Sequence, residues 1–181
     1  LYTQVSVVAQ SRQINNDGTQ WKKIEIARNK LIKTLEGRLD KNLQRIFQLL
    51  GLKYPPEDIE NAFQGIKNRK PDVRMSAVEF LDNVLEMNLK KVVIPIAETA
   101  LLDAVVDITI KLLGLKIKTE FECLTMLLSS EDPSLQVNTL QLIALLKDDD
   151  YLPDISKMLD SPDAEVRRIA KKTLKNYGVM V

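Results

Sequence analysis

The sequence predicts an all-α protein built from antiparallel pairs of helices. Hydrophobic residues make up 45% of its 181 residues, while aromatic residues make up 5% and there are six glycines, a composition that disfavours a β-sandwich or a β-barrel. Apolar residues recur at helical spacing through most of the chain. At this length the chain fits one domain or one short array of helical repeats.

The helix expected near the C-terminus has clear boundaries. Ser161 is expected to cap it, Pro162 suits a first helical turn, and Gly178 is a stop signal. Its inward face is formed by residues at helical spacing: Val166, Ile169, Ala170, Thr173, Leu174 and Tyr177. A shorter helix over 152–159 precedes it and supplies an antiparallel partner across a short turn.

Residues 1–18 show little periodicity, so we expect a linker or loosely ordered segment there and a helical repeat domain over 19–181. The first helix of that domain is expected to end at Gly37 and the second, from Leu39, at Gly51. Arg28 falls on the inward face of the first helix, where its long stem matters as much as its charge.

Later helices follow from breaks and caps in the sequence. Two prolines at 55 and 56 precede a short helix ending at Asn68, and a second helix follows from 70. A short helix interrupted by Pro95 and an apolar helix over 99–113 come next. Thr119 and Glu122 have the spacing of a capping box, and Pro133 opens the helix that ends at 146.

The helix pairs repeat with a period near 31 residues. Val73 and Val166 align with one another when the segments that contain them are superposed, and they lie 93 positions apart, which is three times 31. The alignment also places Arg74 on Arg167. Stepping through the chain at this period predicts five helix pairs, of which the first and third are atypical.

The motif Asp-x-x-Val-Arg-x-x-Ala, or close to it, opens the second helix of these pairs, as at 163–170. It resembles the HEAT repeat, in particular the short HEAT-like type named for phycobilisome lyases, and the resemblance implies a HEAT-like α-solenoid of about five antiparallel helix pairs. More loosely, the phrases at 45–62, 77–85 and 93–96 look like the soluble helical tail of bacterial membrane proteins similar to ATP/ADP translocases.

The composition offers little chemistry for catalysis. There is no His, which excludes His-based acid–base chemistry and His-containing metal sites, and the single Cys123 lies in a helical apolar pattern that indicates a buried residue. Asp103, Asp107 and Lys111 are expected to be the polar stripe of a helix, with too few ligands for a metal. We therefore predict no catalytic residue, no metal site and no cofactor.

Two groups of polar residues are candidates for an interaction surface. Arg74 and Arg167 are expected to form an Asp/Arg ladder between repeats, and the carboxylates that follow Arg74 are expected to be solvated or to take part in such a ladder. The last helix carries a basic face that could contact phosphate or anionic lipid. The candidate surface consists of Arg74, Glu79, Asp82, Asn83, Arg167, Arg168, Lys171 and Lys172.

The expected function is a protein-interaction or regulatory scaffold whose partner is another protein or a domain of the same polypeptide. With 26 basic and 25 acidic residues the net charge is +1, so nucleic acid is not an expected partner. The alternatives are a HEAT-like enzyme or accessory subunit, either a chromophore lyase or one acting on nucleic acid, and a passive spacer.

The expected location is the cytoplasm. The chain begins with Leu1 and shows no secretory leader, so we expect a piece of a larger protein. The second resemblance implies that this protein is bacterial and that the piece is the soluble domain of an inner-membrane protein. Contact with a membrane would then come only through flanking sequence.

Overall fold

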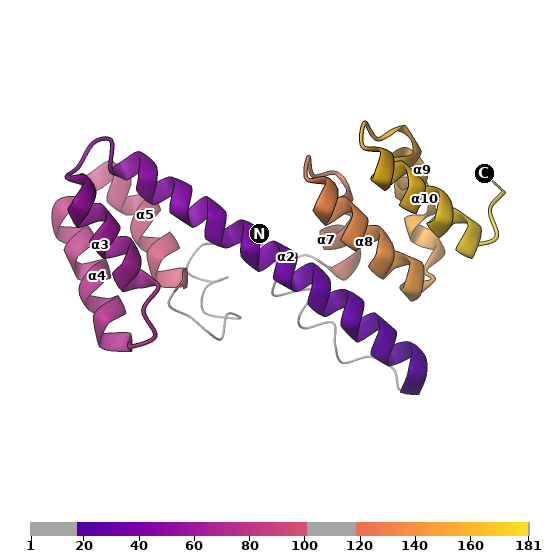
Figure 1. The fold of residues 1–181 in the computed structure, drawn as a ribbon, viewed down its shortest axis with the longest axis horizontal. Helices are drawn as coiled ribbons and strands as arrows, with labels where there is room; N and C mark the ends of the chain where they lie inside the picture. Colours follow the sequence, from indigo (N-terminus) through magenta and orange to yellow (C-terminus); the bar gives the residue numbers. More distant parts are fainter. Residues whose placement is uncertain (1–17, 101–118, 181) are drawn as a thin grey trace. The chain divides into compact units, whose positions relative to one another are not determined.

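The computed structural model describes residues 18–100 and 119–180, whose regular secondary structure is entirely helical, so the all-α prediction is confirmed (Figure 1). The α-helices are α2 (Gly18–Leu50), α3 (Pro56–Ile66), α4 (Pro71–Val84), α5 (Met87–Ala100), α7 (Glu120–Leu128), α8 (Pro133–Leu146), α9 (Leu152–Lys157) and α10 (Ala164–Asn176). The 3-10 turns η2 (Asp149–Tyr151) and η3 (Met158–Asp160) flank α9. The linker predicted over 1–18, apart from its last residue, and the polar stripe of Asp103, Asp107 and Lys111 lie outside the described residues.

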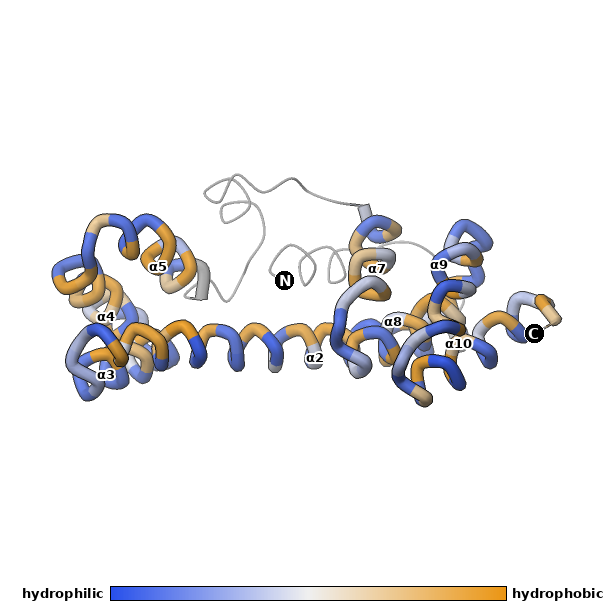
Figure 2. The backbone as a smooth tube through the Cα atoms, turned by 90° about the horizontal axis from the view of Figure 1, so that it is seen from above, coloured by the Kyte–Doolittle hydropathy of each residue, from blue (hydrophilic) through white to orange (hydrophobic). Residues whose placement is uncertain are grey.

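The chain divides into two compact units, each with its own hydrophobic core. We call residues 1–38 and 117–181 the α7–α10 unit, and residues 39–116 the α3–α5 unit, so that α2 contributes to both. Each core is formed by the apolar stripes of the helices that enclose it. Figure 2 shows these stripes as hydrophobic turns alternating with hydrophilic ones, most plainly along α2. None of the helices described is long and apolar enough to cross a membrane.

Helix α2 runs without a break through Gly37, so the helix end predicted there is wrong, and the first predicted pair of helices is a single helix of 33 residues. A glycine inside a helix costs about 1 kcal/mol relative to alanine. That cost is small beside the burial of apolar residues on both sides of it, such as Leu35 at 0% exposure and Leu43 at 5%. Tertiary packing therefore outweighs the local stop signal.

The α7–α10 unit begins at the predicted capping box. The hydroxyl of Thr119 accepts a hydrogen bond from the backbone N–H of Glu122, and the carboxylate of Glu122 accepts one from the N–H of Thr119. Helices α7 and α8 pack together, α9 packs against α10, and α10 also packs along α8. The predicted inward face of α10 is buried from Val166 to Leu174.

The start of α10 differs from the prediction. The cap is Asp163, whose carboxylate accepts hydrogen bonds from the N–H groups of Glu165 and Val166 at 2.9 and 3.0 Å. The Ser161 hydroxyl accepts from the N–H of Asp163 instead, within the turn before the helix. The predicted stop is confirmed, because Gly178 adopts the left-handed φ of 79° just after the last helical residue.

In the α3–α5 unit, α3 and α4 form a hairpin that packs on α5 and on the C-terminal part of α2. Phe47 of α2 and Phe63 of α3 stack with ring centroids 5.2 Å apart. Gly65 lies directly against Ala77 of α4, where a side chain would not fit without movement. Helix α5 continues through Pro95, so the interruption predicted there is wrong.

Candidate functional site

Arg74 and Arg167, which the repeat alignment superposes, make the same local contact in their two units. The Nη1 of Arg167 donates to the carbonyl oxygen of Ser161 at 2.6 Å, and the Nη1 of Arg74 donates to that of Asn68 at 3.3 Å. In both cases the acceptor lies six residues earlier, in the turn that joins the helices of a pair. Asp163 is used as a helix cap rather than as the acidic rung of a ladder. These arginines therefore close turns within a hairpin.

The other predicted residues of α10 lie on its exposed face. Arg168 donates from Nε to the carboxylate of Glu165 at 2.7 Å, and this hydrogen bond lowers the pKa of the Glu165 carboxyl below its ordinary value. Lys171 and Lys172 are exposed and form no ion pair with any residue in the described ranges. The basic face of α10 is thus a solvated face with part of its charge neutralised.

The predicted residues of α4 are exposed as well. Glu79 and Asn83 point to solvent, and the Asp82 carboxylate lies 3.6 Å from the Nζ of Lys90 in α5. The eight predicted surface residues therefore comprise four in the α3–α5 unit and four in the α7–α10 unit. Of the four in the α3–α5 unit, Arg74 lines a cavity.

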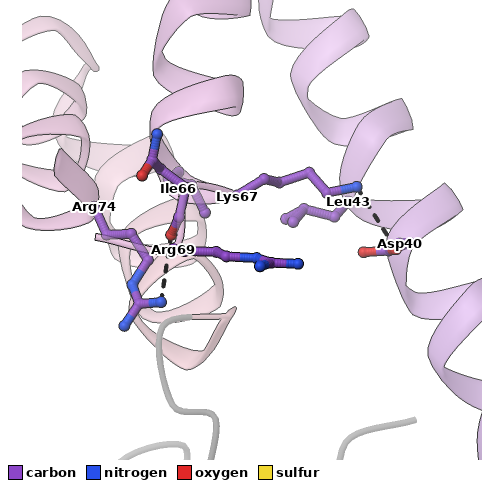
Figure 3. Close-up of a pocket in the computed structure, with 7 residues that line it drawn as sticks. Asp40, Leu43, Ile66, Lys67, Arg69 and Arg74 are labelled. Carbon is purple, nitrogen blue, oxygen red and sulfur yellow. Dashed lines mark hydrogen bonds and ion pairs between the residues drawn. The ribbon is translucent and has the colours of Figure 1, made fainter. Parts of the chain in front are cut away.

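That cavity, which we call the basic pocket, has a volume of about 510 Å³ and lies between α2 and the loop that joins α3 to α4. Its lining consists of Asp40, Leu43, Ile66, Lys67, Asn68, Arg69 and Arg74. Figure 3 shows the side chains of Lys67 and Arg69 extending from the loop toward α2, where the Nζ of Lys67 lies 3.6 Å from the Oδ2 of Asp40. Among the described residues that line the pocket there are thus three cations and one carboxylate.

A second hollow, which we call the hairpin groove, is lined by α3 and α4 and has a volume of about 350 Å³. The residues that line it recur at helical spacing on each helix: Asp58, Asn61, Ala62 and Gly65 on α3, and Val73, Ser76, Ala77 and Phe80 on α4. Its floor is narrow because Gly65 lets the two helices approach closely. Apolar residues and the polar residues Asp58, Asn61 and Ser76 both line the groove.

The equivalent face of α10 is covered. Stepping forward by 93 residues takes Val73, Ser76 and Phe80 to Val166, Ile169 and Thr173. Those three are 0%, 7% and 2% exposed, since α8 and the shorter helix of the pair pack on α10. In α4, by contrast, Val73 is 38% exposed, Ser76 is exposed and Phe80 is half-buried. The hairpin groove therefore corresponds to a face on which a helix packs in the α7–α10 unit, and no helix among the described residues buries it to the same extent.

Cys123 and the tyrosines with shifted pKa values do not line either hollow. Cys123 is buried at 0% exposure in the core of the α7–α10 unit. The tyrosines whose pKa is raised, Tyr151 and Tyr177, owe the shift chiefly to burial in that same core. Within residues 18–100 and 119–180, no group of three or more acidic or Cys side chains is placed to hold a metal ion.

Comparison with known proteins identified no relative: no family model matches the chain, and neither a curated protein nor a solved structure matches it. The sequence analysis missed both hollows, although each has a signal in the sequence. The run from Lys67 to Lys70 holds three cations, and Ser76 places a polar residue where the repeat alignment puts the inward Ile169.

Proposed function

We propose that this chain is a protein-interaction module whose hairpin groove receives an amphipathic helix of a partner protein. The observation that carries the proposal is the contrast between Val73, which is 38% exposed, and its equivalent Val166, which is 0% exposed. In the α7–α10 unit a helix occupies this face, so the geometry of the groove suits another helix.

The charges beside the groove define the partner further. Helices α3 and α4 together carry six carboxylates, at positions 57, 58, 60, 72, 79 and 82, against a single cation, Arg74, which lines the basic pocket instead. Asp58 lines the groove itself. A partner helix with an apolar stripe and flanking Lys or Arg residues would complement this surface, because opposite charges at the rim favour encounter and fix orientation.

The proposal keeps the wider expectations drawn from the sequence. We take the helix pairs to be a HEAT-like stack, in which recognition by exposed helix faces is the usual mode of binding. In the context of a larger bacterial membrane protein, the module would be the cytosolic part and the partner either a regulator or another domain. Its role would be binding rather than catalysis.

Substitution of Ser76 tests the proposal, because Ser76 is exposed and lines the groove. Ser76→Arg should obstruct the groove and repel a basic helix, whereas Gln64→Arg adds the same side chain at an exposed position of α3 outside the lining. The immobilised full chain and both variants would be exposed to lysate of the source organism, and captured segments would be synthesised as peptides.

The expected result is a partner whose contacting peptide is amphipathic, has more Lys and Arg than Asp and Glu, and binds the Gln64→Arg variant as well as the unmodified chain. The Ser76→Arg variant should bind that peptide at least about tenfold more weakly, as expected for loss of a central contact. Equal binding by all three proteins, or an acidic peptide, would contradict the groove as the docking site.

A further inference from the structure

The basic pocket is a second site, independent of the hairpin groove, and we infer that it binds a small phosphorylated anion. The inference begins with the turn that joins α3 to α4. Its equivalent in the α7–α10 unit, the turn between α9 and α10, shares the arginine contact, since Arg74 and Arg167 each donate to the carbonyl oxygen six residues earlier. The two turns thus have the same local construction.

They differ in charge. The positions of Lys67 and Arg69 correspond, 93 residues later, to Asp160 and Pro162, and neither of these is a cation. A helical turn of this kind therefore forms without the two basic residues. Their presence in the α3–α4 loop is not required by the fold, and it adds two positive charges beside Arg74.

The cations of the pocket are only partly neutralised by the protein. Lys67 approaches Asp40 at 3.6 Å, a weak pair whose carboxylate side chain is 65% exposed. Arg69 makes no hydrogen bond or ion pair with any described residue, and its side chain reaches across the pocket toward α2 (Figure 3). Among the described residues that line the pocket, Lys67 and Arg69 share a single carboxylate, Asp40, so this pair of cations has a positive surplus.

The shape and chemistry of the pocket select the ligand class. Its volume of about 510 Å³ lies within the range of small-molecule sites. Guanidinium groups present a planar fork that matches phosphoryl oxygens, and lysine adds a compact point charge. The side chains come from both the loop and the start of α4, so they can contact more than one phosphoryl group. Leu43 and Ile66, both buried, provide an apolar floor beside them.

Inorganic pyrophosphate is the probe that tests this site, by calorimetric titration of the full chain. Arg69→Gln should weaken binding by about tenfold or more, the loss expected for one charge-assisted contact, while Asp40→Asn should tighten it because it removes the carboxylate that competes with the anion for Lys67. Lys171→Gln, an exposed cation of α10 outside the pocket, is the matched control and should leave the affinity unchanged.

Three outcomes would overturn the inference. The first is no heat of binding with pyrophosphate at millimolar concentration. The second is equal weakening by Arg69→Gln and Lys171→Gln, which would indicate nonspecific attraction to positive charge. The third is binding to vesicles that contain phosphatidic acid without binding to free pyrophosphate, which would assign the cations to a membrane surface. Since Arg69 does not line the hairpin groove, these results are independent of the peptide experiment.

Discussion

Gly65 is the residue that sets the distance between the two helices of the hairpin groove. A Cβ atom placed on Gly65 would lie 2.7 Å from the Cβ of Ala77, which is closer than non-bonded Cβ contacts in proteins. Gly37, in the interior of α2, has nothing within 4 Å of the same added atom. Substitutions at the two glycines therefore distinguish the effect of close packing on stability from the effect of helix propensity.

We predict that Gly65→Ala lowers the free energy of unfolding by about 1–2 kcal/mol, because overpacking exceeds the gain in helix propensity. Gly37→Ala should instead raise it by up to about 1 kcal/mol, since only the propensity term acts there. Urea denaturation followed by circular dichroism measures both. A stabilising Gly65→Ala would show that the helices are not in contact at this point.

Arg28 is a buried cation with incomplete hydrogen bonding. It is 4% exposed, and its Nη2 donates to the Oε1 of Glu120 at 2.9 Å, while its Nε and Nη1 are buried with no hydrogen-bond partner in the part of the chain that the structure describes. The guanidinium carbon also lies 5.8 Å from the ring centroid of Trp21. Burying a guanidinium with two unused donors is costly, so its stem contributes more to stability than its charge does.

Arg28→Met should therefore leave the free energy of unfolding within about 1 kcal/mol of the unmodified value. Arg28→Ala, which removes the stem as well, should lower it by about 2–4 kcal/mol, as other large-to-small core substitutions do. Thermal or urea unfolding of the two variants distinguishes the contributions. Equal losses in both would mean that the ion pair with Glu120 is the stabilising element.

At the scale of an element, α10 shows how a cap fixes a helix start. Asp163 accepts two backbone N–H groups of the first turn, and its carboxylate lies at the positive end of the helix. Asp160, three residues earlier, is an exposed carboxylate in η3 and caps no helix.

We expect Asp163→Ala to reduce the stability of the chain by about 1 kcal/mol, and Asp160→Ala to change it by less than about 0.5 kcal/mol. Denaturant titration of the pair provides the comparison. If both substitutions had the same effect, general loss of negative charge near the basic α10 would explain it better than capping.

Helix pairing shows what the sequence could and could not predict. The capping box at Thr119 and the stop at Gly178 depend on local chemistry, and both were predicted correctly. The continuity of α2 through Gly37 depends on burial on either side, which a stop signal does not reveal. The repeat alignment likewise identified Val73 and Val166 as equivalent positions, but it could not predict that Val166 is buried while Val73 is partly exposed.

At the scale of the whole molecule, two tyrosines make the free energy of unfolding depend on pH. Burial raises the pKa of Tyr151 above its ordinary value of 10.0, and the pKa of Tyr177 is also raised, chiefly by burial. The folded chain therefore retains phenolic protons that the unfolded chain releases near pH 10. Their contribution to stability is fully present below about pH 10 and is lost as the pH rises through the folded pKa values.

Unfolding measured at a series of alkaline pH values should show this loss. The Tyr177→Phe variant should be less stable by about 1 kcal/mol near neutral pH, because it lacks the hydrogen bond to the Ile143 carbonyl oxygen at 2.9 Å. Its stability should then fall less steeply above pH 10 than that of the unmodified chain. Parallel curves would assign the alkaline loss to lysines instead.

The open groove on the α3–α4 hairpin is the central claim, and site-specific photo-cross-linking tests it most directly. A photoreactive amino acid at position 76 of the full chain, and separately at position 64, would be activated in lysate of the source organism. The account predicts that position 76 cross-links to an amphipathic, basic helical segment of another protein and that position 64 does not. The same products from both positions, or cross-links from position 76 only to a second copy of this chain, would contradict it.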